Sequence, residues 1–143
     1  MQRFEYSVRL TPAVEGGFVV SCRDLPQLVT QGETLEHALS EAADAMDEVF
    51  AAYMYGRVDF PAPSKGRKGE RLVSPPAGTA AKAALHVAMQ EAGTTNVQLG
   101  TRLGMDEKEV RRMLDPHCSP KLPQIGRAMG ALGCRLVIGL EPL

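Results

Sequence analysis

The residues whose types and spacing best fit a chemical task are three cations in one amphipathic stretch, Lys108, Arg111 and Arg112. Lys and Arg side chains bind phosphate, and an Arg can also donate two hydrogen bonds to one guanine edge. Asn96 and Glu107 lie in the same segment, and with the three cations they form our set of candidate DNA-contacting residues. These residue types indicate recognition of a nucleic acid rather than bond-breaking chemistry.

The segment 96–115 around these cations predicts two short helices joined by a tight turn. Apolar residues at helical spacing give each helix one buried side: Leu99 and Leu103 in the first, Val110, Met113 and Leu114 in the second. Gly100 lies where the helices would cross, Gly104 ends the first helix, and Asp106 caps the second. In the docking geometry of a helix-turn-helix, the second helix enters the major groove with its N-terminal residues against base edges.

Residues that could break bonds or hold metals have weaker support. Glu5, Asp24 and Glu33 could serve a two-metal nuclease, which needs clustered carboxylates, but a module of this size supplies no full set. The histidines and cysteines lack ligand or disulfide spacing, and they are His37, His86, His117, Cys22, Cys118 and Cys134. We therefore expect no catalytic residue, no metal and no cofactor.

Charge and composition divide the chain into two parts. Residues 1–64 carry four basic and ten acidic residues, and residues 65–143 carry twelve basic and seven acidic ones. All seven aromatic residues fall in the first part. We predict two modules with different partners, residues 1–76 and residues 77–143.

The first module predicts a small antiparallel sheet and one long helix. Alternating apolar residues indicate strands at 4–10 and 18–22, joined by a Glu-Gly-Gly turn, and shorter strands at 28–30 and 71–74. A helix begins after the cap Thr34, and its apolar side continues for about five turns to Tyr53.

The opposite side of this helix is acidic and contains no Lys or Arg. Four of its residues, Glu41, Asp44, Asp47 and Glu48, are our candidates for contact with a basic partner. Their mutual repulsion would be relieved by a basic partner. An ordinary solvated helix face is the equally weighted alternative.

A basic run, Lys65-Gly66-Arg67-Lys68-Gly69, follows the helix after a Pro-rich segment. It breaks any periodicity, so we expect extended or mobile chain there. The run is either a phosphate-seeking arm or a soluble spacer.

The second module predicts four helices and a final strand. Helices at 79–91 and 122–132 flank the helix pair, Gly133 stops the last one, and residues 135–140 are apolar and partly β-branched. No other segment of this module is strand-like, so we expect the strand to pair with the same strand of a second subunit about a two-fold axis. The candidate dimerisation residues are Leu136, Val137, Ile138 and Leu140. Such a dimer would present two recognition helices one DNA turn, ~34 Å, apart and would bind a palindromic site.

No apolar run approaches the ~18 residues that a membrane span needs, and the N-terminus lacks the apolar region of a signal peptide. The sequence therefore predicts a cytoplasmic protein with no membrane partner.

Several motifs resemble the HicB antitoxin family. They are Gly16-Gly17-Phe18-Val19-Val20, Asp24-Leu25-Pro26, the run from Thr30 to Ala38, the Pro61-Ala62-Pro63-Ser64 segment, and the ending with Pro123, Ile125, Ala128 and Ala131-Leu132-Gly133. Gln27 and Arg23 stand where the family usually has glycine and proline. The resemblance covers most of the chain.

The resemblance implies an α+β protein. Its N-terminal βββαβ domain would have a partial RNase H-like fold, followed by an all-α, Cro/repressor-like helix-turn-helix domain with a C-terminal dimerising strand. It implies the antitoxin of a type II toxin–antitoxin system. Such an antitoxin covers the active site of HicA, a small basic ribonuclease, and represses its own operon, alone or with the toxin bound. We expect a homodimer, with a tetramer left open. The alternative is a stand-alone helix-turn-helix repressor whose N-terminal domain senses a small ligand. An adjacent gene for a small basic protein would favour the antitoxin.

Overall fold

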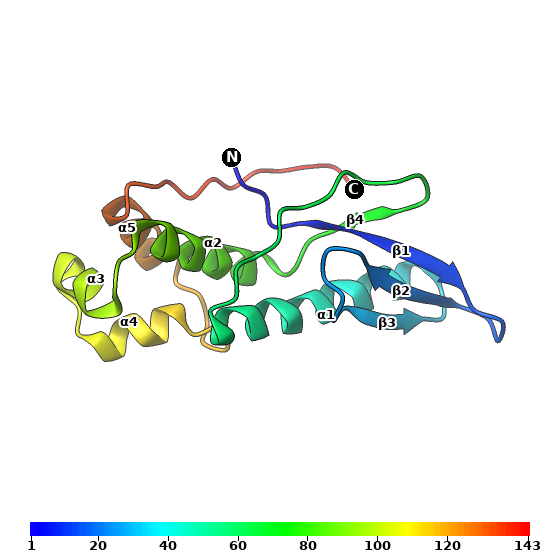
Figure 1. Ribbon diagram of the computed structural model, residues 1–143, viewed down its shortest axis with the longest axis horizontal. Helices are drawn as coiled ribbons and strands as arrows, with labels where there is room; N and C mark the ends of the chain where they lie inside the picture. The colour runs from blue at the N-terminus through cyan, green and yellow to red at the C-terminus, as the bar shows by residue number, and fades with distance from the viewer. The chain divides into compact units, whose positions relative to one another are not determined.

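Four strands and five helices follow one another in the computed structural model, which describes residues 1–143 (Figure 1). The strands are β1 (Tyr6–Pro12), β2 (Phe18–Cys22), β3 (Val29–Gly32) and β4 (Arg71–Val73). The helices are α1 (Leu35–Gly56), α2 (Ala77–Ala92), α3 (Asn96–Leu103), α4 (Glu107–Leu114) and α5 (Leu122–Ala131). The fold is mixed α+β, as predicted. The chain divides into two compact units, Met1–Ala80 and Ala81–Leu143.

The first unit is one antiparallel sheet with α1 on one face. The strand order is β3-β2-β1-β4, so β1 lies between the hairpin partner β2 and the returning strand β4. Tyr6, Val8 and Val20 point to the covered face and are at most 1% exposed. The predicted order of three strands, a helix and a fourth strand is confirmed, and the Thr34 hydroxyl caps α1 by accepting from His37 N–H at 3.1 Å.

An aromatic cluster fixes the chain after α1 to this unit. The Phe50 ring lies 4.7 Å from that of Phe60 and contacts Tyr6 edge-on. The Tyr6 hydroxyl donates to the Pro61 carbonyl at 2.7 Å. Burial, with Asp24 nearby, raises the pKa of Tyr6 to about 12, so the phenol keeps its proton for this bond.

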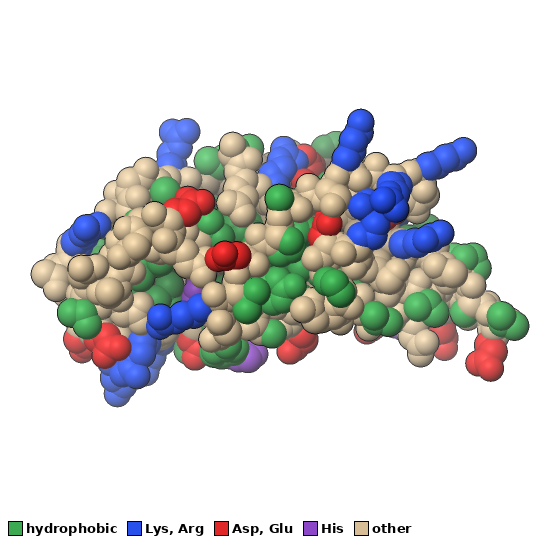
Figure 2. All heavy atoms as spheres, in the orientation of Figure 1, with side chains coloured by type: hydrophobic (Ala, Val, Ile, Leu, Met, Phe, Trp, Pro, Cys, Tyr) green, Lys and Arg blue, Asp and Glu red, His purple; other side chains and the backbone are tan.

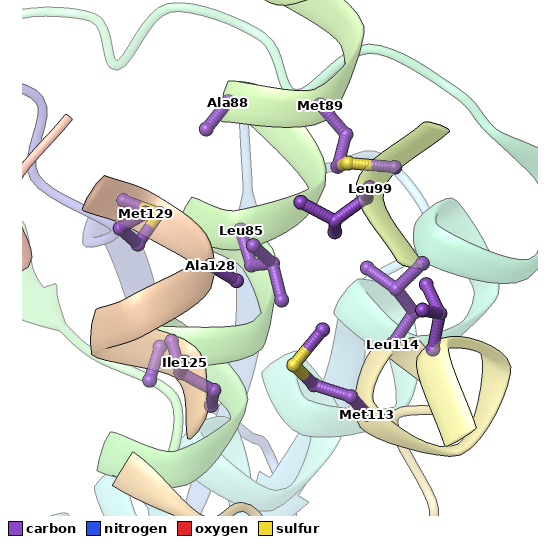
Figure 3. Packing of buried hydrophobic residues seen from close by; sticks show 11 residues of the cluster. Leu85, Ala88, Met89, Leu99, Met113, Leu114, Ile125, Ala128 and Met129 are labelled. Atoms are coloured by element: carbon purple, nitrogen blue, oxygen red, sulfur yellow. The ribbon is translucent and has the colours of Figure 1, made fainter. Parts of the chain in front are cut away.

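The second unit is a helical core to which α2, α3, α4 and α5 each contribute. Figure 3 shows apolar side chains from all four helices converging, and Leu85, Leu99, Val110 and Ile125 are fully buried. α2 begins two residues before its predicted start, and Gly133, at φ 76°, follows α5 as predicted. None of the chain's helices combines the length and the apolar content that crossing a membrane requires.

The predicted final strand is not formed in the single chain. Residues 134–143 contain no helix or strand. Leu136 packs against the core of the second unit, whereas Val137, Ile138 and Leu140 are exposed. A strand needs a neighbour for its N–H and C=O groups, and every regular element that lies wholly in this unit is helical. Pairing between two copies therefore stays a prediction.

Candidate functional sites

The helix pair α3–α4 begins with a capping box that sequence reasoning missed. The Thr95 hydroxyl accepts from Gln98 N–H at 3.1 Å, and the Gln98 side chain accepts from Thr95 N–H at 3.0 Å. These bonds make Thr95 the N-cap of α3, and Asn96, a candidate DNA contact, is the half-buried first residue of the helix. The Thr-x-x-Gln spacing in the sequence was the signal that could have found it.

The turn between α3 and α4 requires the two glycines that the sequence placed there. A Cβ on Gly100 would lie 2.6 Å from the Met105 carbonyl oxygen, closer than atoms can approach. Gly104 ends α3 at φ 67°, in the left-handed region that favours glycine. Asp106 then caps α4 by accepting from Glu109 N–H at 2.8 Å. The predicted turn and cap are confirmed.

α4 exposes its cations on one side of the second unit. Lys108 and Arg112 lie four residues apart, so they share a face, and neither has a partner within the chain. Arg111 lies 3.4 Å from the Glu107 carboxylate, with both side chains largely exposed. Lys108 and Arg112 are therefore the cations most available to a phosphate or base, while Glu107 holds Arg111.

The C-terminal end of α4 is held by two side chains of α2. The Lys82 ammonium is 1% exposed and donates to the carbonyl oxygens of Asp115 and Cys118. His86 Nε2 lies 3.0 Å from the Leu114 carbonyl oxygen. Burial lowers the pKa of Lys82, while Cys118 and the Asp115 carboxylate oppose the shift. A buried cation among terminal carbonyls complements the negative end of the helix dipole and fixes where α4 ends.

Two further arginines of this unit bind backbone rather than remaining free. Arg102 donates to the Ala131 carbonyl and Arg127 to the Leu103 carbonyl, each at 3.2 Å. These bonds tie α3 to α5 in both directions. Periodicity alone could not predict them, because both arginines lie on exposed helix positions.

In the first unit, the acidic side of α1 is partly neutralised. Glu41 lies 3.3 Å from His37 Nε2, an i,i+4 pair that forms when the imidazole is protonated. Asp47 accepts a hydrogen bond from the Thr79 hydroxyl. Asp44 and Glu48 have no partner within the chain and are exposed. Of the four candidate residues, these two are the carboxylates most available to a cationic partner.

An apolar hollow of about 360 Å³ lies beside Glu48. Its other lining residues are Gln27, Val49, Ala52, Tyr53 and Val58. The Tyr53 hydroxyl donates to Gln27 Oε1 at 3.1 Å, which fixes one wall. Protein interfaces combine an apolar centre with a polar rim, so this hollow with Glu48 at its edge is a candidate protein-binding patch.

The three carboxylates that a two-metal nuclease would need do not cluster in the structure. Glu5 pairs with Arg3, Asp24 accepts two hydrogen bonds from Ser64, and the Glu33 carboxylate belongs to no such set. No group of three or more His, Cys, Asp or Glu side chains could hold a metal ion. All three cysteines are free thiols.

Comparison with known proteins gives matches over both units. Residues 5–84 match the family described as "HicB_like antitoxin of bacterial toxin-antitoxin system". The antitoxin HicB 1 of Photorhabdus laumondii is 33% identical over 141 residues, which are 99% of this chain and 90% of the relative. The chain belongs to the HicB antitoxin family.

Other HicB antitoxins match over similar lengths. The antitoxin HicB of Escherichia coli strain K12 is 34% identical over 131 residues, 92% of this chain and 95% of the relative. The antitoxin HicB 2 of Photorhabdus laumondii is 38% identical over 122 residues, 85% of this chain and 86% of the relative. The acidic side of α1 lies within the HicB family match, whereas α3 and α4 lie beyond residue 84 and are covered by the longer matches.

Proposed function

We propose that this HicB-family antitoxin masks a small basic HicA-like ribonuclease with its first unit and binds operator DNA with its second unit. The observation that carries the proposal is that the outer side of α1 exposes carboxylates without partners within the chain, Asp44 and Glu48, while α4 exposes cations without partners, Lys108 and Arg112. The mechanism is steric masking and operator binding, and no bond is made or broken.

The toxin-binding half of the proposal uses the acidic side of α1 and the hollow beside it. A basic toxin is attracted to Asp44 and Glu48, which speeds encounter, and apolar toxin side chains enter the hollow, which slows dissociation. Glu41 and Asp47 lie on the rim of the patch with partners of their own. The first unit supports this role as a rigid, partial RNase H-like scaffold.

The DNA-binding half assigns α3–α4 as a Cro/repressor-like helix-turn-helix. α4 then enters the major groove, where Lys108 and Arg112 contact phosphate and guanine, and Asn96 at the start of α3 contacts phosphate. Arg111 and Glu107 contact DNA only if their ion pair opens. Two copies paired through residues 136–140 bind a palindromic operator, and this binding represses the operon.

Two charge-changing variants test the two halves separately. Arg112→Ala removes a bidentate guanine contact worth about 1–3 kcal/mol, so we expect weaker and less selective binding to the upstream DNA of its own operon. The same variant should protect cells from the toxin as well as the parent does. Asp44→Lys with Glu48→Lys should do the reverse, with toxin capture lost and DNA binding kept.

The matched control changes two exposed acids outside α1, Glu15→Lys with Asp59→Lys, and should leave toxin capture intact. Gel retardation at fixed salt and pull-down of the toxin encoded next to this gene provide the two measurements. A parent protein that neither retards its upstream fragment nor captures that toxin would contradict the proposal.

A further inference from the structure

The segment Ser64–Arg71, which we name the basic loop, is tied down although it contains almost no regular secondary structure. At its start, the Asp24 carboxylate accepts from Ser64 N–H at 2.8 Å and from the Ser64 hydroxyl at 2.5 Å. At its end, Arg23 donates to both Glu70 oxygens, at 2.7 and 3.0 Å. Arg23 also donates to the Lys65 carbonyl at 3.1 Å. Adjacent residues of one turn, Arg23 and Asp24, thus hold both ends of the loop.

The same contacts remove the loop's one negative charge from its surface. The Glu70 side chain is 6% exposed, and its carboxylate also accepts from Arg67 N–H at 2.6 Å. Lys65 and Lys68 are exposed and have no partner within the chain, and Arg67 is exposed and attracts the Glu70 carboxylate. Arg71 is exposed as well, but it lies opposite Val8 in the β1–β4 register and therefore belongs to the α1 face of the sheet. The loop therefore presents positive charge only.

A cation from the sheet extends this surface. A Cβ on Gly66 would lie 3.2 Å from the Ser7 hydroxyl, so the loop crosses β1 on the face opposite α1. Arg9 is two residues further along β1, which places it on that same face, and it is exposed without a partner. Figure 2 shows Lys and Arg side chains gathered where the basic loop lies in Figure 1.

We infer that the basic loop, together with Arg9, binds the phosphate backbone of duplex DNA. A fixed row of cations is suited to phosphates because it makes contacts without first being ordered. Single-stranded RNA is recognised largely by stacking bases on aromatic side chains, and the basic loop contains none. Five of the seven aromatic rings are instead packed together around Phe50 and Phe60.

This inference rests on the proposed operator binding by the second unit. Once α4 holds DNA, the basic loop is tethered to the same duplex or to a neighbouring one at high effective concentration, so weak phosphate contacts add measurable affinity. Such contacts carry no sequence information. The first unit would therefore add affinity and salt dependence, while α4 supplies the sequence preference.

The test uses a full-length double variant that carries both Lys65→Gln and Lys68→Gln. Its binding to a duplex from the region upstream of its own gene is compared with that of the parent protein. Each phosphate contact contributes about 0.9 to the slope of log affinity against log salt. We expect the double variant to lower that slope by about 1 to 2 and to weaken binding several-fold at low salt. Sequence preference against a scrambled duplex should be unchanged.

The matched control, Arg3→Gln with Arg57→Asn, removes the same charge from exposed sites outside the loop. Asn is used at position 57 because Arg57 has a positive φ of 53°, which Asn tolerates. An equal drop in slope for this control, or no drop for the loop variant, overturns the inference and leaves operator binding standing. A larger effect on single-stranded RNA than on duplex overturns it as well. A parent that binds no duplex overturns both proposals.

Discussion

At the scale of single residues, the burial of Glu70 leaves the basic loop with only positive charges at its surface. The Glu70 carboxylate accepts hydrogen bonds from the Arg23 side chain and from the Arg67 N–H. These bonds lower the pKa of Glu70 to about 2, and the bond from Arg23 has the larger effect. Arg23 and Glu70 are 47 residues apart, so no local pattern in the sequence could pair them. The sequence predicted the charges of the loop but left open whether it is a soluble spacer or a phosphate-seeking arm. The conformation of the loop depends on a long-range contact, which local sequence patterns do not reveal.

Glu70 also predicts an acid-dependent change. Because protonation of this carboxyl is disfavoured in the folded state, its ionised form stabilises the fold above its ordinary pKa of 4.5. That contribution is lost as the pH falls from about 4.5 toward 2. We expect Glu70→Gln to lower the thermal midpoint at pH 7 and to reduce the further drop between pH 5 and pH 3. Melting curves followed by circular dichroism measure both.

The control for this prediction is Glu15→Gln, at an exposed turn position with no partner within the chain. It should reproduce the pH dependence of the parent. If Glu70→Gln also reproduces it, the ion pair does not stabilise the first unit.

At the scale of elements, local sequence patterns predicted the helices, the strands of the sheet and the turns between them. Alternation and helical spacing predicted all four strands of the sheet and all five helices, and Gly104 and Asp106 marked the turn between α3 and α4. Lys82 escaped prediction because its burial depends on carbonyls 33 and 36 residues away. The final strand is not formed in the single chain, and the partner strand that we propose for it would belong to a second copy.

The turn between α3 and α4 gives a prediction about stability. Gly100→Ala places a methyl against the Met105 carbonyl, which should destabilise the second unit by about 1–3 kcal/mol, as overpacking does. Gly126→Ala in α5 adds a methyl with no atom within 4 Å. It should stabilise the unit by about 0.5–1 kcal/mol, because Ala has the higher helix propensity.

Urea unfolding of the two variants and the parent gives the comparison. The two substitutions are chemically identical, so a difference in sign isolates the close approach at Gly100. Equal stabilisation by both would mean that α3 and α4 can move apart at no cost.

At the scale of the whole molecule, the proposed dimer depends on exposed apolar residues near the C-terminus. Ile138 is 75% exposed and Leu140 is 98% exposed, whereas Leu136 packs inward. If two copies pair through these residues, light scattering should give twice the 15.4 kDa of one chain. Ile138→Lys should then give the mass of one chain at micromolar concentration.

Val14→Lys, at the turn between β1 and β2, is the control because Val14 is fully exposed in the other unit. It should leave the mass unchanged. A parent protein with the mass of one chain would contradict pairing through residues 136–140. A dimer that persists in Ile138→Lys would show that the two copies associate through a different surface.

The seclusion of the Lys82 amine has a practical consequence. Amine-reactive reagents and acetyltransferases need solvent access to the nitrogen, which Lys82 lacks while its side chain remains between α2 and the end of α4. The exposed lysines of the chain should be labelled quickly, and Lys82 only when the second unit opens. The rate of its labelling, followed over time by mass spectrometry, therefore reports on the opening of the helical unit in the unaltered protein.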